Sequence, residues 1–364
     1  MGEVKSILKV ASIYMATIIG AGFASGQEIV QFFSTYYEGG FYGIILAGIL
    51  FSIIGYTVLD RVYRERIRNY DEFLFPSVGW TLGWIIEIIV ALFVLSLFCI
   101  MIAGSGRILT EKFTLPFHWC VVIMAAIVML ILMTDIKGVV AVSSFITPIL
   151  IIGIISVGFY IILFKDTYVF NIGLDLEKIT HNWFFSSIIY VSYNSILSVV
   201  ILCSMLPYLK TRKTGVLGGI LGGMLLCFIA FILNTAMYMF YPDILKNELP
   251  VLGIIGRYNE TITNLYTLVL WLAMVVSALT SGYCFVERVG TKITIHPKIL
   301  VVVTCALAIP MSSLGFSNLI ATLYPIFGYA GMFMVFIILI QWIKTSPVLY
   351  LVKANHVFKG GRRK

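Results

Sequence analysis

Residues 18–28 read IIGAGFASGQE and lie within the first long apolar run of the chain. They place three glycines, then an amide and a carboxyl group, where a membrane helix should be most apolar. Glycine costs about 1 kcal/mol relative to alanine inside a helix. Backbone groups freed by unwinding are tolerated in lipid only where they line a cavity or bind a ligand. The stretch therefore predicts an interrupted helix, and close packing through small residues is the alternative explanation.

The whole chain has the composition of an integral membrane protein. Of its 364 residues, 60% are hydrophobic and 12% are charged, and the mean hydropathy is +1.02. Soluble globular proteins have about 45–50% apolar and about 25% charged residues. The six cysteines all fall in apolar runs without C-x-x-C spacing, so we expect small buried side chains and neither a disulfide framework nor a metal site. A soluble enzyme, a secreted disulfide scaffold and a nucleic-acid-binding protein are excluded.

Apolar runs long enough to cross about 30 Å of hydrocarbon predict ten membrane helices. Lysine and arginine residues concentrate in every second connecting segment, for example at Arg61, Arg64, Lys210 and Arg212. Such a bias sets the orientation, so both termini are expected in the cytoplasm, with the basic tail at 344–364 against the anionic inner leaflet. The expected spans are 7–36, 41–59, 82–103, 119–133, 139–164, 183–209, 216–241, 262–286, 299–310 and 319–343.

The spans divide the chain into two halves of similar length, 7–164 and 183–343. Each half has an odd number of spans, so the second half would cross the membrane in the opposite direction. Inverted repeats underlie many secondary transporters, in which interrupted helices at corresponding positions bind substrate near the midplane. We therefore predict one transporter domain over 1–364, with its first and sixth helices interrupted. The second break is expected at Ser192–Tyr193–Asn194–Ser195, for which an inter-helical hydrogen-bonding cluster is the alternative.

The string GAGFASGQE resembles the YkvI-type family of uncharacterised bacterial membrane proteins, and the topology resembles the LeuT-fold transporters of the amino acid, polyamine and organocation superfamily. The resemblance implies an all-α membrane protein of ten transmembrane helices in two inverted five-helix repeats, in the bacterial cytoplasmic membrane. In that fold the unwound centres of helices one and six hold the substrate. The substrate-binding residues would be Gly20, Ala21, Gly22, Phe23, Ala24, Ser25, Gln27, Glu28, Tyr193, Asn194 and Ser195.

The eighth span contains Ser277-Ala278-Leu279-Thr280-Ser281, which resembles the Thr-Ser pair that ligates sodium in sodium-coupled members of this fold. The resemblance implies a site made by the hydroxyls of Thr280 and Ser281 and by the carbonyls of Ser277, Ala16 and Ile19. A hard cation prefers oxygen ligands, and the end of a half-helix presents unpaired carbonyls. The alternative is that both hydroxyls bond to their own helix. No lysine lies in 139–164, where proton-coupled relatives often have one, and no cofactor other than sodium is expected.

Two carboxyl groups, Glu28 and Glu87, lie inside predicted spans, where an ionisable residue suggests a function. Glu28 would face the outer part of the central cavity, where it would attract a cationic group of the substrate, belong to an outer gate or carry a coupling proton. Glu87 lies about one turn inside the cytoplasmic interface and is expected to snorkel or to pair with a basic inner loop.

These features predict a secondary active transporter that moves a small amino-acid-like or amine solute by alternating access, with sodium symport. Its partners would be the lipid bilayer and a small-molecule substrate, and no nucleic acid. Two alternatives stay open: a ligand-sensing receptor subunit of the germinant-receptor type, and a proton-coupled transporter that uses Glu28. An enzyme is disfavoured because the chain has no H-E-x-x-H or G-x-S-x-G motif.

Overall fold

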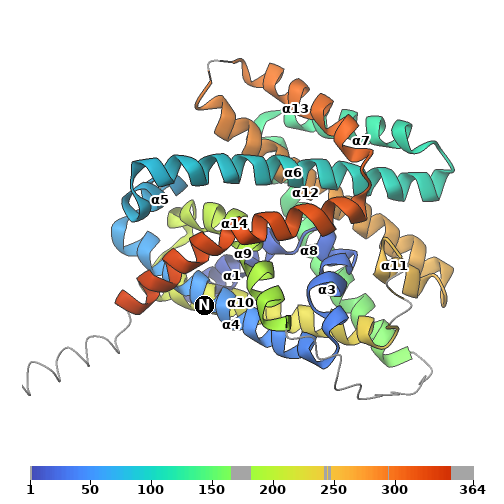
Figure 1. Cartoon of the computed structure of the whole chain (residues 1–364), viewed down its shortest axis with the longest axis horizontal. Coiled ribbons are helices and arrows are strands. Elements are labelled where there is room, and N and C mark those ends of the chain that lie inside the picture. The colour runs from blue at the N-terminus through green and yellow to red at the C-terminus, as the bar shows by residue number, and fades with distance from the viewer. Residues whose placement is uncertain (1, 165–181, 242–243, 245–246, 294, 346–364) are drawn as a thin grey trace, which may run out of the picture.

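The structure is a computed structural model that describes residues 2–164, 182–241, 244, 247–293 and 295–345 (Figure 1). The described residues form helices and no strand. Most of the predicted tail at 344–364 lies outside them. Among the described residues, six helices are long and apolar enough to cross a membrane, so the chain is a multi-pass helical membrane protein. They are α4 (Glu38–Glu65), α6 (Trp80–Phe113), α9 (Trp183–Cys203), α10 (Arg212–Tyr238), α12 (Glu260–Gly290) and α14 (Phe316–Thr345).

Shorter apolar helices fall where the remaining predicted spans lie. They are α7 (Phe117–Leu132), α13 (Pro297–Ser312) and the second half of α8 (Asp135–Phe164). Two short helices, α5 (Tyr70–Val78) and α11 (Pro250–Ile255), connect longer ones. Both begin with residues that favour the start of a helix. The Asn69 side chain caps α5, and Pro250 occupies the first turn of α11.

The predicted break in the first span is confirmed. The segment consists of α1 (Gly2–Ile18), α2 (Ala21–Ala24) and α3 (Gln27–Phe32), followed by a 3₁₀ turn at Ser34–Tyr36. Gly20 is extended, with φ −102° and ψ −170°, and Gly26 is left-handed, with φ 82°. A left-handed residue is cheap only for glycine, so Gly26 fixes the turn between α2 and α3.

The predicted break in the sixth span is wrong. Helix α9 runs without interruption from Trp183 to Cys203, with Ser192–Ser195 near its middle. This stretch contains neither glycine nor proline. Asn194 Nδ2 and Ser195 Oγ donate to the carbonyls of Tyr190 and Val191 in the preceding turn, at 3.0 and 2.6 Å. Because these side chains find acceptors within the helix, their polarity does not unwind it.

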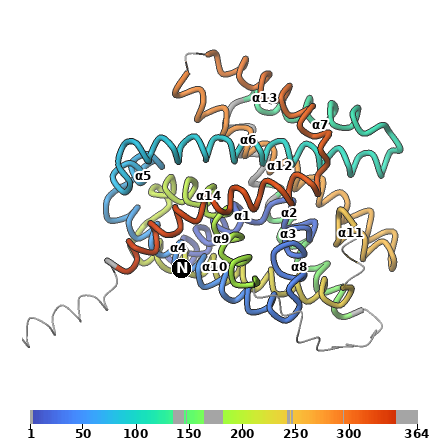
Figure 2. The backbone as a smooth tube through the Cα atoms, in the orientation of Figure 1, coloured from blue at the N-terminus to red at the C-terminus, as the bar shows by residue number. Residues whose placement is uncertain are grey.

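Glycines allow the closest helix packing in the structure. Helix α10 lies against α4 and α1, and the backbones meet at Gly55 and Gly219, where an added Cβ would overlap the facing main chain. Gly218 and Gly222 receive Val10 and Tyr14 of α1. The glycines of α10 therefore form a face that packs against α4 and α1. Figure 2 shows α6, α7 and α13 on one side of the molecule and α4 and α10 on the other, with the interrupted segment between them.

Candidate functional site

The end of α1 presents main-chain oxygens with no helical partner. Ile19 N donates to Met15 O at 2.8 Å, and Gly20 N donates to Ile18 O at 2.9 Å. Among the described residues, no backbone N–H donates to the carbonyls of Ala16 or Ile19. A Cβ on Gly20 would lie 3.4 Å from Ser277 Oγ, so α12 packs directly beside this end of the helix. The break therefore supplies free carbonyls next to the hydroxyl-bearing face of α12.

Glu28 lies in the first turn of α3 and is buried, with 3% of its surface exposed. Its Oε2 atom accepts a hydrogen bond from the Tyr193 hydroxyl at 2.7 Å. Its Oε1 atom lies over Gly22, where a Cβ would overlap it. The structure thus brings together three predicted substrate residues, from α2, α3 and α9. No salt bridge from a basic residue in the described part of the chain reaches this carboxyl group.

Aromatic side chains surround the Glu28–Tyr193 pair. The ring of Tyr193 lies 4.5 Å from that of Tyr324 on α14, 5.5 Å from those of Tyr190 and Phe32, and 6.3 Å from that of Phe93 on α6. Four separate elements therefore build one cluster around a carboxyl group. Aromatic faces and a carboxylate both attract cations, so this arrangement is suited to a small cation or amine.

Short contacts cover the other side of the break. Val251 N of α11 donates to Ser25 O at 3.0 Å, and Tyr266 of α12 donates its hydroxyl to Ala24 O at 2.7 Å. Gln27 Nε2 donates to Ser317 Oγ of α14 at 2.8 Å. The carbonyls at the end of α2 are therefore held by α11 and α12, and the start of α3 is tied to α14. These contacts close this side of the interrupted segment.

The remaining predicted substrate residues divide into two groups. Ala21, Gly22, Phe23, Ala24 and Ser25 are buried along α2, and Ser25 Oγ donates to Gly22 O at 2.9 Å. Asn194 and Ser195 direct their donors to their own helix, as described above. Of the polar cluster on α9, Tyr193 is the residue whose side chain bonds to the interrupted segment. The roles of all these residues stay predictions.

Of the predicted sodium ligands on α12, Ser277 lies beside the break, since a Cβ on Gly20 would be 3.4 Å from its Oγ atom. Thr280 Oγ1 donates to Val276 O at 2.9 Å, and Ser281 Oγ donates to Ser277 O at 2.6 Å. A hydroxyl that donates one hydrogen bond still has lone pairs for a cation. The chemistry of hydroxyl and carbonyl oxygens suits sodium, and within the described residues no cluster of three His, Cys, Asp or Glu side chains could hold a metal ion.

Tyr324, Phe32, Phe93 and Tyr266 contact the site but were not among the predicted substrate residues. A tyrosine in the middle of an apolar span was the available signal for Tyr324, because its hydroxyl needs a polar neighbour when buried. The phenylalanines carry no such signal. The pairing expected for Glu87 is confirmed, since its Oε1 atom accepts from Arg288 Nη1 at 2.6 Å.

No family model matches the chain. It is 24% identical over 333 residues to the uncharacterised membrane protein YkvI of Bacillus subtilis, covering 90% of this chain and 93% of YkvI. It is 27% identical over 328 residues to the uncharacterised protein YyaD of the same organism, covering 90% of this chain and 94% of YyaD.

Solved transporters share the fold. A manganese transporter of Eremococcus coleocola aligns with a TM-score of 0.61 at 13% identity, over 93% of this chain and 79% of that one. Mhp1, a nucleobase-cation-symport-1 family transporter, gives 0.57 at 16% identity, over 87% and 74%. A Na⁺-coupled sialic acid symporter gives 0.57 at 15% identity, over 91% and 78%. The chain is thus a homologue of the membrane protein YkvI and of YyaD, with a fold like that of the LeuT-fold transporters.

Proposed function

We propose that the chain is a secondary active transporter that moves a small amino-acid-like or amine solute by alternating access, with sodium symport. The observation that carries this proposal is the buried Glu28 carboxyl group on the interrupted segment, hydrogen-bonded to Tyr193 within a cluster of aromatic rings. A buried carboxylate is costly unless a positive group compensates it. A cationic group of the solute would supply that compensation. The likeness of the fold to solved transporters supports the same class.

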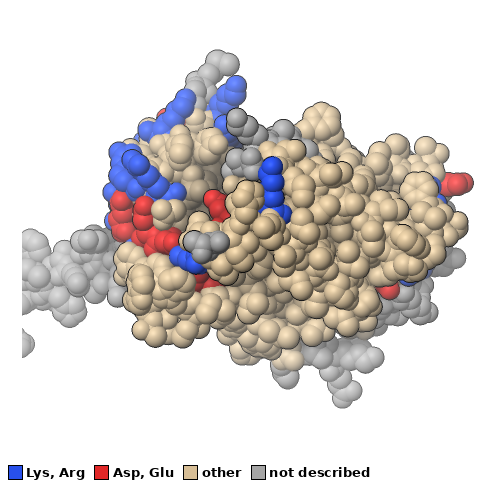
Figure 3. Space-filling model, turned by 90° about the horizontal axis from the view of Figure 1, so that it is seen from above, with Lys and Arg blue, Asp and Glu red and all other residues tan. Residues whose placement is uncertain are grey.

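The proposed topology has ten spans in two inverted repeats, with both termini in the cytoplasm. The distribution of charge supports this orientation, because most of the charged side chains in Figure 3 gather at one end of the molecule. Arg61 and Arg64 lie in the last two turns of α4, Arg212 begins α10, and Arg288 lies in the last turn of α12. Asp60 pairs with both Arg64 and Arg212, so these two helix ends lie together. Basic residues are enriched on the cytoplasmic side of membrane proteins.

In the proposed sodium site, the carbonyls of Ala16, Ile19 and Ser277 and the hydroxyls of Thr280 and Ser281 would ligate the ion. The two carbonyls on the interrupted segment lack backbone donors, and α12 lies against Gly20. An ion there would fix the main chain that leads to Gly22 and Glu28. Sodium would thereby favour the substrate-binding arrangement, which is the physical basis of coupling.

Opening towards the outside requires the contacts over α2 and α3 to separate. These are the Val251–Ser25, Tyr266–Ala24 and Gln27–Ser317 hydrogen bonds. Substrate would then reach Glu28 and the ring of Tyr193. Re-formation of the three hydrogen bonds would enclose the bound substrate. The small number of such contacts is consistent with a gate that opens and closes reversibly.

The test is a thermal-shift screen of the purified chain against amino acids and amines in sodium or potassium, followed by uptake of the best ligand into proteoliposomes. We expect stabilisation by an amine that is larger in sodium, and uptake driven by an inward sodium gradient. Binding without sustained flux would contradict the transporter and favour a ligand-sensing receptor. Uptake driven equally by a proton gradient without sodium would contradict sodium symport.

A further inference from the structure

A cavity of about 520 Å³ lies near the end of α4 that carries Arg61 and Arg64, and Glu28 does not line it. It opens between α4, α5 and α14. Its polar wall includes Arg61, Arg64, Glu65 and Ser77, and its apolar wall includes Ile337 and Ile340 of α14. No part of the proposed transport site lines it. A cavity with separate charged and apolar walls suits an amphipathic ligand.

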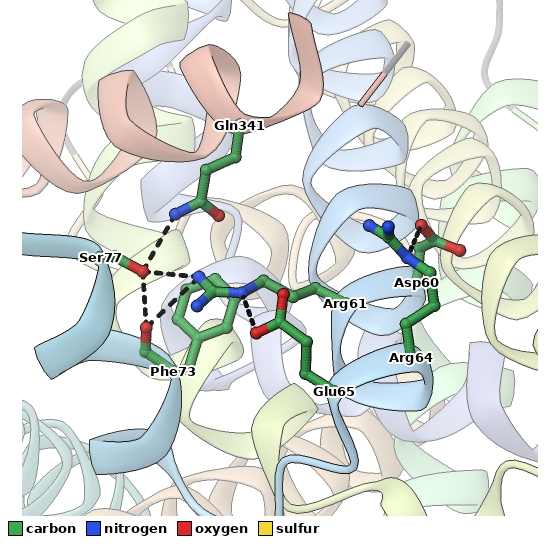
Figure 4. A network of polar contacts seen from close by, with 7 residues as sticks. All are labelled: Asp60, Arg61, Arg64, Glu65, Phe73, Ser77 and Gln341. Carbon is green, nitrogen blue, oxygen red and sulfur yellow. Dashed lines mark hydrogen bonds and ion pairs between the residues drawn. The ribbon is translucent and has the colours of Figure 1, made fainter. Parts of the chain in front are cut away.

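The guanidinium group of Arg61 is held in place on the polar wall (Figure 4). Its Nε atom pairs with Glu65 Oε2 at 2.7 Å, and its Nη1 atom donates to Ser77 Oγ at 2.5 Å and to Phe73 O at 3.4 Å. The group also lies over the ring of Phe73, 4.6 Å from its centroid. Only 13% of the side chain is exposed. Such fixed donors lower the entropy cost of binding an anion.

Arg64 lies on the same wall and is less constrained. Its Nε atom pairs with Asp60 Oδ2 at 2.9 Å, and 43% of its side chain is exposed. Within the described residues, no hydrogen bond or ion pair is made by its two terminal amino groups. Asp60 is shared with Arg212, so it neutralises Arg64 incompletely. Arg64 therefore has donors available for a ligand in the cavity.

The charge of the lining matches a phosphodiester. The two guanidinium groups and the single carboxylate leave one net positive charge, and a phosphodiester carries one negative charge. Guanidinium groups form paired hydrogen bonds with phosphate oxygens. The apolar wall belongs to α14, whose Phe336 and Ile343 are 60% and 49% exposed on the outside of the bundle. Those exposed side chains suit contact with lipid on the helix that forms the apolar wall.

We propose that this cavity binds the phosphodiester headgroup of a membrane phospholipid. Arg64 and Arg61 would contact the phosphate, and the glycerol and first acyl carbons would lie along Ile337 and Ile340. Basic pockets between membrane helices are known to bind lipid headgroups. This site is independent of the transported solute. A bound lipid would join α4 and α5 to α14, the helix that also carries Ser317 and Tyr324.

The first test is native mass spectrometry of the full chain in detergent, titrated with phosphatidylglycerol or with diacylglycerol of the same acyl chains. Diacylglycerol lacks the phosphate and should bind weakly. We expect Arg64→Ala to weaken phosphatidylglycerol binding about tenfold, the effect of losing a hydrogen bond to a charged group. Arg107→Ala is the matched control. The Arg107 side chain is also 43% exposed, and its Nε atom also pairs at 2.9 Å with a carboxylate of its own helix, Glu111 Oε1. Equal losses for both variants would overturn the proposal.

A second pair of variants tests the cavity without changing its charge. Ile340→Trp should fill part of the cavity from its apolar wall and reduce phosphatidylglycerol binding. Ile343→Trp, on the exposed face of α14, should leave that binding unchanged. Inorganic phosphate, added alone in a thermal-shift assay, separates a lipid from a soluble ligand. Stabilisation by phosphate that depends on Arg64, without phosphatidylglycerol binding, would overturn the lipid assignment. Phosphatidylglycerol binding that survives both Arg64→Ala and Ile340→Trp would overturn the site itself.

Discussion

The carboxyl group of Glu28 depends on the absence of a side chain at Gly22, because a Cβ there would overlap Oε1. We expect Gly22→Ala to push the carboxyl group away from Tyr193 and to weaken amine binding about tenfold, as loss of a charge-assisted hydrogen bond would. Binding is measured by isothermal titration calorimetry with the amine found by screening. Gly290→Ala is the control, since a Cβ there would meet only Leu300, at 3.9 Å. Unchanged binding in Gly22→Ala would remove Glu28 from the substrate site.

A separate prediction concerns the negative charge of Glu28. Glu28→Gln keeps the size of the side chain and an oxygen that can accept from the Tyr193 hydroxyl. It removes the negative charge, so we expect an amine to bind at least tenfold more weakly while the melting temperature stays within a few degrees. Tyr193→Phe removes the hydrogen bond but keeps the ring, so its effect should be smaller. If both variants bind the amine as the wild type does, the carboxyl group has no part in recognition.

Single residues also explain which parts of the site were predictable. Glu28 and Tyr193 were found because polar groups are expensive at the middle of an apolar span. Phe32 and Phe93 were not, because a phenylalanine in a membrane helix can equally face lipid or a binding site. Contacts between residues that lie far apart in sequence, such as Gln27 with Ser317, cannot be predicted from a single sequence.

At the scale of helices, α12 and the end of α1 would share the sodium ion. We expect the double substitution Thr280→Ala with Ser281→Ala to abolish the dependence of amine binding on sodium and to leave expression unchanged. Thr267→Ala is the control, because Thr267 lies on the same helix and donates to Thr263 O in the way that Thr280 donates to Val276 O. Binding is compared in sodium and in potassium. A double variant that keeps the full sodium effect would contradict the assignment.

The two predicted breaks had different outcomes because the local chemistry differs. Residues 18–28 contain three glycines, which weaken the helix and allow the left-handed turn at Gly26. In α9, Asn194 and Ser195 donate to carbonyls one turn earlier and Tyr193 donates to Glu28, so these three side chains have acceptors without unwinding of the helix. In α10, glycines within an apolar span pack against α4 and α1 without a break, so the break after α1 depends on the backbone conformations of Gly20 and Gly26 and not on glycine content alone. The long apolar spans were predictable because apolar runs and membrane thickness define them, whereas the short helices α5 and α11 were not predicted.

For the whole molecule, the proposed alternating access would require α3 and α14 to separate during each transport cycle, and the Gln27–Ser317 hydrogen bond of 2.8 Å joins them in this structure. We expect Gln27→Cys with Ser317→Cys, joined by a short bis-methanethiosulfonate reagent, to reduce amine uptake into proteoliposomes at least tenfold, because a closed outer side admits no new substrate. Reduction of the cross-link should restore uptake, and each single variant treated with the reagent controls for reaction at the native cysteines. Substrate already bound before cross-linking should still be released on the inner side. Full uptake through quantitatively cross-linked protein would mean that this contact stays closed during transport, and the outer path would then have to lie elsewhere in the molecule.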